Sequence, residues 1–111
     1  MSTRDLVGYG PNPPVVQWPN GARIAVSVVV NYEEGSEYSL LDGDPHGESS
    51  GESPSNVPAG ERDLANESFF EYGSRVGVWR IMNVMDQYNV KGTFFACALA
   101  LERNPEVGPE I

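Results

Sequence analysis

A chain of 111 residues, 40% of them hydrophobic, is long enough for one small domain and too short for two. Its net charge is −9, and eleven of its sixteen acidic residues lie between Glu33 and Glu71. Such a surface repels phosphate groups, which argues against binding to nucleic acid or to an anionic membrane. No run of residues resembles a membrane span or the apolar core of a signal peptide, so we expect a cytoplasmic protein.

The N-terminal third of the chain predicts an extended segment followed by a strand. Residues 1–22 are rich in proline, which biases the backbone towards extended geometry, and we expect an extended lead-in there. Residues 23–31, RIAVSVVVN, form an almost unbroken hydrophobic run. Runs of this kind are typical of strands that are buried on both faces, as in parallel sheets.

An acidic loop is expected over residues 32–66, where Gly, Ser, Pro, Asp and Glu predominate. A stretch of this length without a regular pattern is either a functional loop or disordered. His46, the only histidine, lies within it and is expected to be solvated. The surrounding residues DGDPHGE lack the full spacing of a calcium-binding loop.

The remaining chain predicts a helical region and a second strand. Residues 67–89 are expected to be helical, with Asn66 as the N-cap and with apolar residues at helical spacing, among them Val78 and Met82. Residues 90–111 are expected to form a second buried strand and the start of another helix. Cys97, the only cysteine, is expected to pack as a small buried hydrophobe.

These elements predict an α/β fold in which two parallel strands are joined by a helical crossover. Two strands buried on both faces cannot close a sheet, because their edges and faces need further partners. We therefore expect residues 1–111 to be a single incomplete domain, the N-terminal part of a larger α/β protein.

Two adjacent carboxylates, Glu33 and Glu34, directly follow the first expected strand. In parallel α/β folds, functional residues gather at the C-terminal ends of strands. Three interpretations stay open at this point: one acid carries a proton, one acid binds a divalent metal, or the pair belongs to a solvated acidic loop.

The other sequence motifs give little further indication of function. The chain has no G-x-S-x-G nucleophile motif and no G-x-x-x-x-G-K-[ST] phosphate loop. Arg75 lies near the start of the main expected helix, where a turn at Gly73 and Ser74 would present backbone N–H groups to an anion. With one histidine and one cysteine, the chain cannot build a histidine-rich metal site by itself.

The segments RIAVSVVVNYEEGSE and FEYGSRVGVWRIMNVMDQYNVKGTFFACALALERNPE together resemble the N-terminal part of the polysaccharide deacetylase family. The likeness is to the subgroup that contains metal-independent allantoinase and cyclic-imide hydrolases. This resemblance implies a distorted (β/α) barrel with mainly parallel strands and the hydrolysis of non-peptide C–N bonds.

The family's first motif, Thr-Phe-Asp-Asp-Gly, corresponds here to the residues from Asn31 to Gly35. The resemblance implies that Glu33 is the catalytic base and that Glu34 stands at the metal-ligand position. Each acid is one methylene longer than in the motif, so we expect no cofactor, with Glu34 as the ligand if the complete fold holds a divalent metal such as zinc. Asn31, Tyr32, Gly35 and Arg75 are the candidate substrate-binding residues.

The sequence thus supports a hydrolase acting on a small amide, a cyclic ureide such as allantoin, or an N-acetylated sugar. The family's later His-x-x-x-His motif is absent, so we expect a truncated chain that is inactive alone, and a homo-oligomer for the complete protein. One alternative is a non-catalytic fragment that folds only with a partner chain. Another is an acidic binding module that uses the loop at residues 36–66.

Overall fold

A computed structural model describes residues 4–51 and 54–111 of the chain. In chain order, its strands and helices are β1 (Val29–Tyr32), α1 (Leu64–Tyr72), α2 (Val78–Gln87), β2 (Thr93–Ala96) and α3 (Ala98–Arg103). A π-helical turn, Gly73–Gly77, joins α1 to α2, so the two helices form one continuous helical segment. Three short 3-10 turns lie at Pro19–Gly21, Leu40–Asp42 and Gly108–Glu110.

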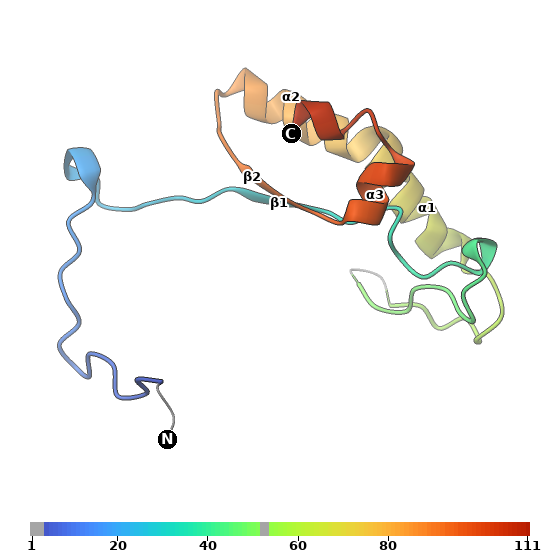
Figure 1. The fold of residues 1–111 in the computed structure, drawn as a ribbon, viewed down its shortest axis with the longest axis horizontal. Coiled ribbons are helices and arrows are strands. Elements are labelled where there is room, and N and C mark those ends of the chain that lie inside the picture. Colours follow the sequence, from blue (N-terminus) through green and yellow to red (C-terminus); the bar gives the residue numbers. More distant parts are fainter. Residues whose placement is uncertain (1–3, 52–53) are drawn as a thin grey trace.

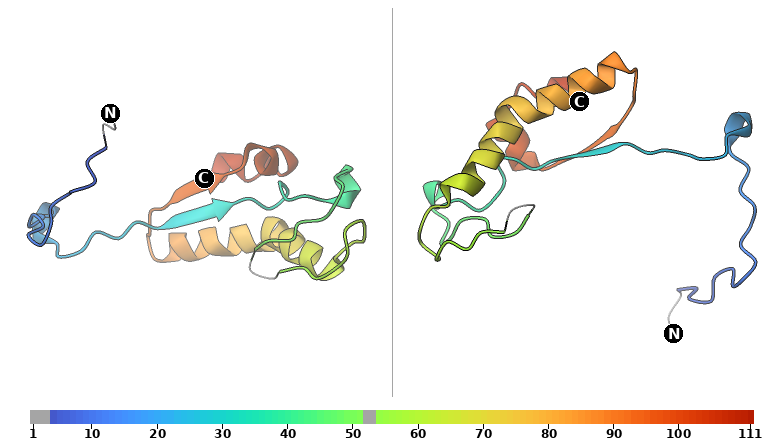
Figure 2. Two further views of the ribbon diagram at one scale, coloured as in Figure 1. Left: turned by 90° about the horizontal axis from the view of Figure 1, so that it is seen from below. Right: turned by 180° about the vertical axis from the view of Figure 1, so that it is seen from behind.

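The two strands pair in parallel, with Val29 opposite Thr93 and Tyr32 opposite Ala96. The helical segment lies on one side of this small sheet, as Figure 1 and the right panel of Figure 2 show. The predicted parallel α/β arrangement is therefore confirmed for this part of the fold. Because the strands are parallel, both end at the same edge of the sheet, and the residues that follow them are neighbours.

The strands are shorter and less buried than the sequence predicts. Strand β1 starts six residues later than expected, because residues 23–27 have no neighbouring strand to pair with among the described residues. The expectation that both faces are buried is wrong for this structure: Val29 is 52% exposed and Phe95 is 73% exposed. Alternate side chains, including Tyr32 and Phe94, point instead towards the helices.

The core lies between the sheet and the helices. Its buried members are Tyr32 of β1, Val78 of α2, Ala100 of α3, and Val107 after α3. Partly buried hydrophobic side chains surround it, namely Trp79, Met82, Phe94, Ala96, Cys97 and Leu101. The helical periodicity noted in the sequence therefore marks the face of α2 that packs on the sheet.

Helix α1 begins at Leu64, three residues earlier than predicted, and its N-cap is Asp63 rather than Asn66. The Asp63 carboxylate accepts hydrogen bonds from the backbone N–H groups of Ala65 and Asn66, at 3.1 and 3.0 Å. Asn66 is buried and donates from its side-chain amide to the carbonyl oxygen of Glu48, at 2.8 Å. This bond ties the acidic loop to α1, so Asn66 has a tertiary role instead of a capping role.

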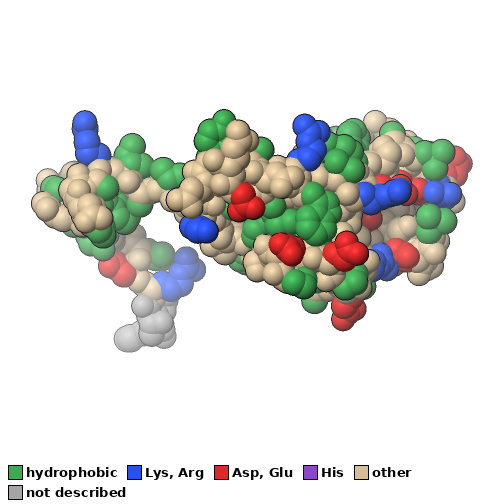
Figure 3. Space-filling view, turned by 90° about the horizontal axis from the view of Figure 1, so that it is seen from above, with side chains coloured by type: hydrophobic (Ala, Val, Ile, Leu, Met, Phe, Trp, Pro, Cys, Tyr) green, Lys and Arg blue, Asp and Glu red, His purple; other side chains and the backbone are tan. Residues whose placement is uncertain are grey.

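Residues 4–27 form an N-terminal arm that runs away from the rest of the molecule (Figures 1 and 2). Its apolar side chains, among them Val15 and Ile24, are exposed. Hydrophobic side chains are also visible at the surface of the helical body in Figure 3. Among the described residues, no helix has the length and hydropathy needed to cross a membrane.

Candidate active site

The chain turns sharply where β1 ends. The backbone N–H and the hydroxyl of Ser36 both donate to the carbonyl oxygen of Glu33, at 2.9 and 2.6 Å, which closes a turn over residues 33–36. Gly35, the third residue of this turn, has a φ of +102°, a conformation that favours glycine. The glycine of the predicted motif is therefore explained by the backbone of the turn that carries the two acids.

The adjacent acids occupy different environments. The Glu33 side chain is exposed, and its carboxylate accepts no hydrogen bond from the described part of the chain. Glu34 is half-buried, packs against Gly73 of the π turn, and accepts a hydrogen bond from the backbone N–H of Glu33 at 3.1 Å. The turn thus leaves one carboxylate accessible to solvent and holds the other against the helical segment.

Arg103, at the end of α3, holds the turn from the other side. Its guanidinium donates to the carbonyl oxygen of Gly35 at 2.7 Å and to the carboxylate of Asp42 at 2.8 Å. Parallel pairing explains this contact, because α3 follows β2 and starts at the edge where β1 ends. The loop after β1 is therefore attached to the element that follows the neighbouring strand.

A second set of contacts joins β1 to the π turn. The Tyr32 hydroxyl and the Ser74 hydroxyl lie 3.2 Å apart, and the Asn104 side-chain amide donates to the Ser74 carbonyl oxygen at 3.1 Å and to its hydroxyl at 3.2 Å. Tyr32 is only 1% exposed. This buried contact fixes the π turn relative to the end of β1.

A cavity of about 330 Å³ opens beside Glu33. Besides that acid, its lining comes from the acidic loop and from α1: Ser36, Glu37, Glu48, Ser50, Gly51 and Phe70. The three glutamates make its wall acidic, while Phe70 supplies an apolar surface. A space of this size and polarity can admit a small polar molecule next to an accessible carboxylate.

The other predicted substrate-binding residues are not gathered around this cavity. Asn31 is exposed in β1, opposite Phe95, and Tyr32 lies in the core. Arg75 is exposed on the π turn, with one guanidinium nitrogen 3.5 Å from the Glu71 carboxylate. Neither Asn31 nor Arg75 lines the cavity, and a role for these residues in substrate binding stays a prediction.

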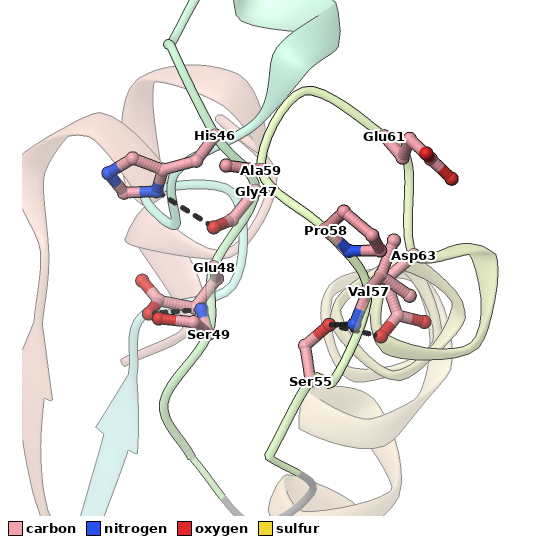
Figure 4. Close-up of a pocket in the computed structure, with 10 residues that line it drawn as sticks. All are labelled: His46, Gly47, Glu48, Ser49, Ser55, Val57, Pro58, Ala59, Glu61 and Asp63. Carbon is pink, nitrogen blue, oxygen red and sulfur yellow. Dashed lines mark hydrogen bonds between the residues drawn. The ribbon is translucent and has the colours of Figure 1, made fainter.

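A separate hollow of about 230 Å³ lies within the acidic loop and is drawn in Figure 4. His46 and Asp63 stand on opposite sides of it; the His46 Nδ1 atom lies 2.9 Å from the Gly47 carbonyl oxygen. Hydrogen bonds from the backbone and hydroxyl of Ser50 lower the pKa of Glu48, so this carboxylate is held in its ionised form. These polar groups bind mainly to their own loop, which indicates a structural role.

The residues described here do not by themselves suit a bound metal ion. No group of three or more His, Cys, Asp and Glu side chains that could hold one occurs in residues 4–51 and 54–111. Glu34, the predicted ligand position, packs on Gly73, and Cys97 lies half-buried beside the core.

Sequence reasoning missed Arg103 and Asn104; it singled out Gly73 and Ser74 as a possible anion-binding turn but missed their contacts with Glu34 and Tyr32. Gly73, Ser74 and Arg103 contact the end of β1 or the turn after it, and Asn104 bonds to Ser74, although all four lie far along the chain. One available signal was the parallel topology, which brings the residues after β2 to the edge where β1 ends. Nothing in the sequence marked the π turn that brings Gly73 against Glu34.

Searches among known proteins found related sequences and structures, although no family model matches the chain. One match is a curated protein of Schizosaccharomyces pombe (strain 972 / ATCC 24843) named "Putative polysaccharide deacetylase". The two sequences are 48% identical over an alignment of 111 residues, and the alignment covers 95% of this chain and 34% of that protein. This chain thus spans about a third of the length of that relative.

Two solved structures are similar throughout most of the chain. Puue allantoinase shares 45% sequence identity with a TM-score of 0.76, and the match covers 96% of this chain and 36% of that one. A "probable Polysaccharide deacetylase" from Pseudomonas aeruginosa PAO1 shares 48% identity with a TM-score of 0.78 and the same coverage. The resemblance to polysaccharide deacetylases and allantoinase that the sequence predicts is confirmed by these matches.

Proposed function

We propose that this chain, which resembles part of polysaccharide deacetylases and of an allantoinase, supplies the carboxylates of a hydrolase for non-peptide C–N bonds. The observation that carries the proposal is the position of Glu33 and Glu34 directly after β1, at the edge where both parallel strands end. Catalytic side chains are typically found at this edge in α/β barrels. Since the chain spans about a third of its relatives, further residues of the site would come from sequence outside it.

Glu33 is the better placed of the two acids to act as a general base. Its carboxylate is exposed and lines the cavity, so it can accept a proton from a water molecule bound there. The resulting hydroxide attacks the carbonyl carbon of the substrate and forms a tetrahedral intermediate. The C–N bond then breaks, and the leaving nitrogen takes the proton that Glu33 had accepted.

Glu34 has a supporting role in this proposal. Its carboxylate accepts a hydrogen bond from the backbone N–H of Glu33, which fixes the backbone next to the base. The mechanism also needs hydrogen-bond donors that stabilise the developing oxyanion, and we assign this role to no residue of this chain.

For the substrate, we favour a small cyclic amide or ureide such as allantoin. The resemblance to an allantoinase favours this class, and a cavity of about 330 Å³ suits a small molecule. An N-acetylated amino sugar is the competing substrate class. The two classes are separated by assaying one panel of allantoin, a cyclic imide and chitooligosaccharides.

To test the proposal, the protein is expressed from its native gene (the native gene product), and this protein and its Glu33→Gln variant are assayed on allantoin, a cyclic imide and chitooligosaccharides. Hydrolysis by the wild-type protein that is abolished by Glu33→Gln supports it. Glu102→Gln, at an exposed glutamate of α3, is the matched control and should retain wild-type activity. A wild-type protein without activity on all three substrates, or a fully active Glu33→Gln variant, would contradict the proposal.

A second candidate function is that of a non-catalytic fragment that works only with a partner chain. The exposed apolar residues of both strands and of α2, including Val29, Phe95 and Ile81, favour this candidate. Hydrolysis by the purified 111-residue chain alone would rule it out. An inactive chain whose native mass is that of a complex with another protein would favour it over the hydrolase.

A further inference from the structure

Gly73 is the residue of the π turn that touches Glu34. A Cβ atom placed on Gly73 would lie 2.7 Å from both Cγ and Oε1 of Glu34, and 2.9 Å from its Cδ. These separations are too short for real contacts between such atoms. Glycine at position 73 therefore permits the observed position of the Glu34 side chain.

The backbone does not explain this glycine. Gly73 has a φ of −56° and a ψ of −51°, ordinary right-handed helical values that any residue adopts. A glycine inside a helical segment is unfavourable relative to alanine, because it loses more conformational freedom on folding. The contact with Glu34 supplies the missing reason for glycine at this position.

The π turn holds Gly73 in place relative to the end of β1. The backbone N–H of Val78 donates to the Gly73 carbonyl oxygen, five residues back, which is the π-helical pattern. The next residue, Ser74, is fixed by its contacts with Tyr32 and Asn104. Such π turns are frequent at functional sites, and this one lies beside the two acids.

We propose that Gly73 is a positioning residue for Glu34: by lacking a side chain, it lets the Glu34 carboxylate fold back against the helical segment towards the Glu33 backbone. The inference rests on the proposed function of the two acids. A methyl group at position 73 would displace the far end of a flexible side chain and leave the helix itself undisturbed. The effect would therefore appear in catalysis and not in folding.

The test compares Gly73→Ala with Gly77→Ala, two glycines of the same π turn. A Cβ on Gly77 would meet its nearest neighbour, the Tyr72 carbonyl oxygen, at 3.6 Å, which is an ordinary contact. We expect Gly73→Ala to lower kcat of the native gene product by about tenfold to a hundredfold with little change in KM, because small misplacements of catalytic groups are costly. Gly77→Ala should stay within about twofold of wild type, and neither variant should melt at a lower temperature.

The effect of Gly73→Ala should depend on the length of the side chain at position 34. In the Glu34→Asp background, where the side chain is one methylene shorter, adding Gly73→Ala should cause no further fall in kcat. An equal fall in both backgrounds would overturn the proposal, as would equal effects of Gly73→Ala and Gly77→Ala.

A spectroscopic measurement keeps this inference separate from the proposed function. In NMR spectra of the 111-residue chain, the Glu34 γ-carbon and carboxyl resonances should shift in Gly73→Ala and remain unchanged in Gly77→Ala. Unchanged Glu34 resonances in Gly73→Ala would overturn the positioning role. The NMR test of the positioning role stays valid even if the wild-type protein hydrolyses none of the substrates. Such a lack of hydrolysis would contradict only the proposed function.

Discussion

Three consecutive residues at the end of β1 differ sharply in their surroundings. Tyr32 is 1% exposed and lies in the core, Glu33 is exposed, and Glu34 is half-buried against Gly73. The alternation of side chains along a strand explains why Tyr32 and Glu33 point in opposite directions. The turn that follows then redirects Glu34 towards the helical segment.

At this scale we predict that Tyr32 contributes mainly to stability. Tyr32→Phe removes the contact between the Tyr32 and Ser74 hydroxyls and should lower the free energy of unfolding by about 0.5–1.5 kcal/mol. Denaturant unfolding of the 111-residue chain measures this. Tyr88→Phe, at an exposed tyrosine, should change it little. A larger effect on KM than on stability would instead show that the hydroxyl contacts the substrate.

At the scale of single elements, helix α1 depends on a side chain outside it. Asp63 caps its first turn, and the Ser55 hydroxyl donates to the other carboxylate oxygen of Asp63 at 2.6 Å. The Ser55 hydrogen bond, followed by the bond from the Asn66 N–H, lowers the pKa of Asp63 below its usual 3.8. Asp63 thereby joins the acidic loop to the start of the helix.

We predict that Asp63→Ala lowers the thermal midpoint by a few degrees near neutral pH, because the helix loses its cap. Asp63→Asn should retain most of the wild-type stability, since asparagine caps helices well. The pKa of Asp63 is lower in the folded state, so its ionised form contributes stability above the unfolded pKa. That contribution is lost as pH falls through the lower folded pKa.

Thermal melts of wild type and Asp63→Ala at several pH values measure this dependence. The gap between the two midpoints should be constant near neutral pH and should narrow below about pH 3.8. If the difference between the two thermal midpoints stays constant through this acidic range, the result would contradict the prediction that the ionised Asp63 carboxylate stabilises the helix.

The sequence predicted those elements whose signal is local. The apolar spacing that includes Val78 and Met82 predicted the helical segment, and the hydrophobic run before Glu33 predicted a strand that ends at the acids. Asn66 was predicted as the N-cap because it directly precedes ESFFEYG and asparagine suits that position; Asp63, which suits it equally, is the cap in the structure. Two contacts separate the choices: Asp63 accepts from the backbone N–H groups of Ala65 and Asn66, and the Asn66 side chain is bonded to Glu48.

The remaining features depend on contacts between distant segments. The π turn at Gly73–Gly77 requires a shift in hydrogen-bond register that Tyr32 and Asn104 stabilise through Ser74. The hydrogen bond from the Arg103 guanidinium to the Gly35 carbonyl oxygen joins residues 68 positions apart in the chain. Burial of both faces of a strand depends on what covers it, and a hydrophobic run alone does not contain that information.

At the scale of the whole molecule, the described residues are not compact. Their radius of gyration is 19.8 Å, whereas a compact domain of about 100 residues has a radius of gyration of about 13 Å. The N-terminal arm accounts for much of this extension, since it runs away from the body in every view (Figures 1 and 2). The helices and the sheet form a body without it.

We predict that limited trypsin digestion removes the arm first. Arg23 is exposed in the arm, whereas Arg103 is bonded to the Gly35 carbonyl oxygen and to Asp42. Proteases cut preferentially where the backbone is exposed and lies outside helices and sheets, so the first large product should start at Ile24. Mass spectrometry identifies the cut, and Arg23→Gln should prevent it. A first cut after Arg103 would contradict the described fold.

We propose that Glu33, presented by the end of β1, is the base of a C–N hydrolase. The decisive measurement is the ratio of kcat/KM for the wild-type gene product to that for Glu33→Gln, on whichever of the three substrates is hydrolysed. We predict a fall of about 10²–10⁴-fold, the usual contribution of a positioned general base. A Glu33→Gln variant within twofold of the wild-type protein, at unchanged stability, would contradict the claim.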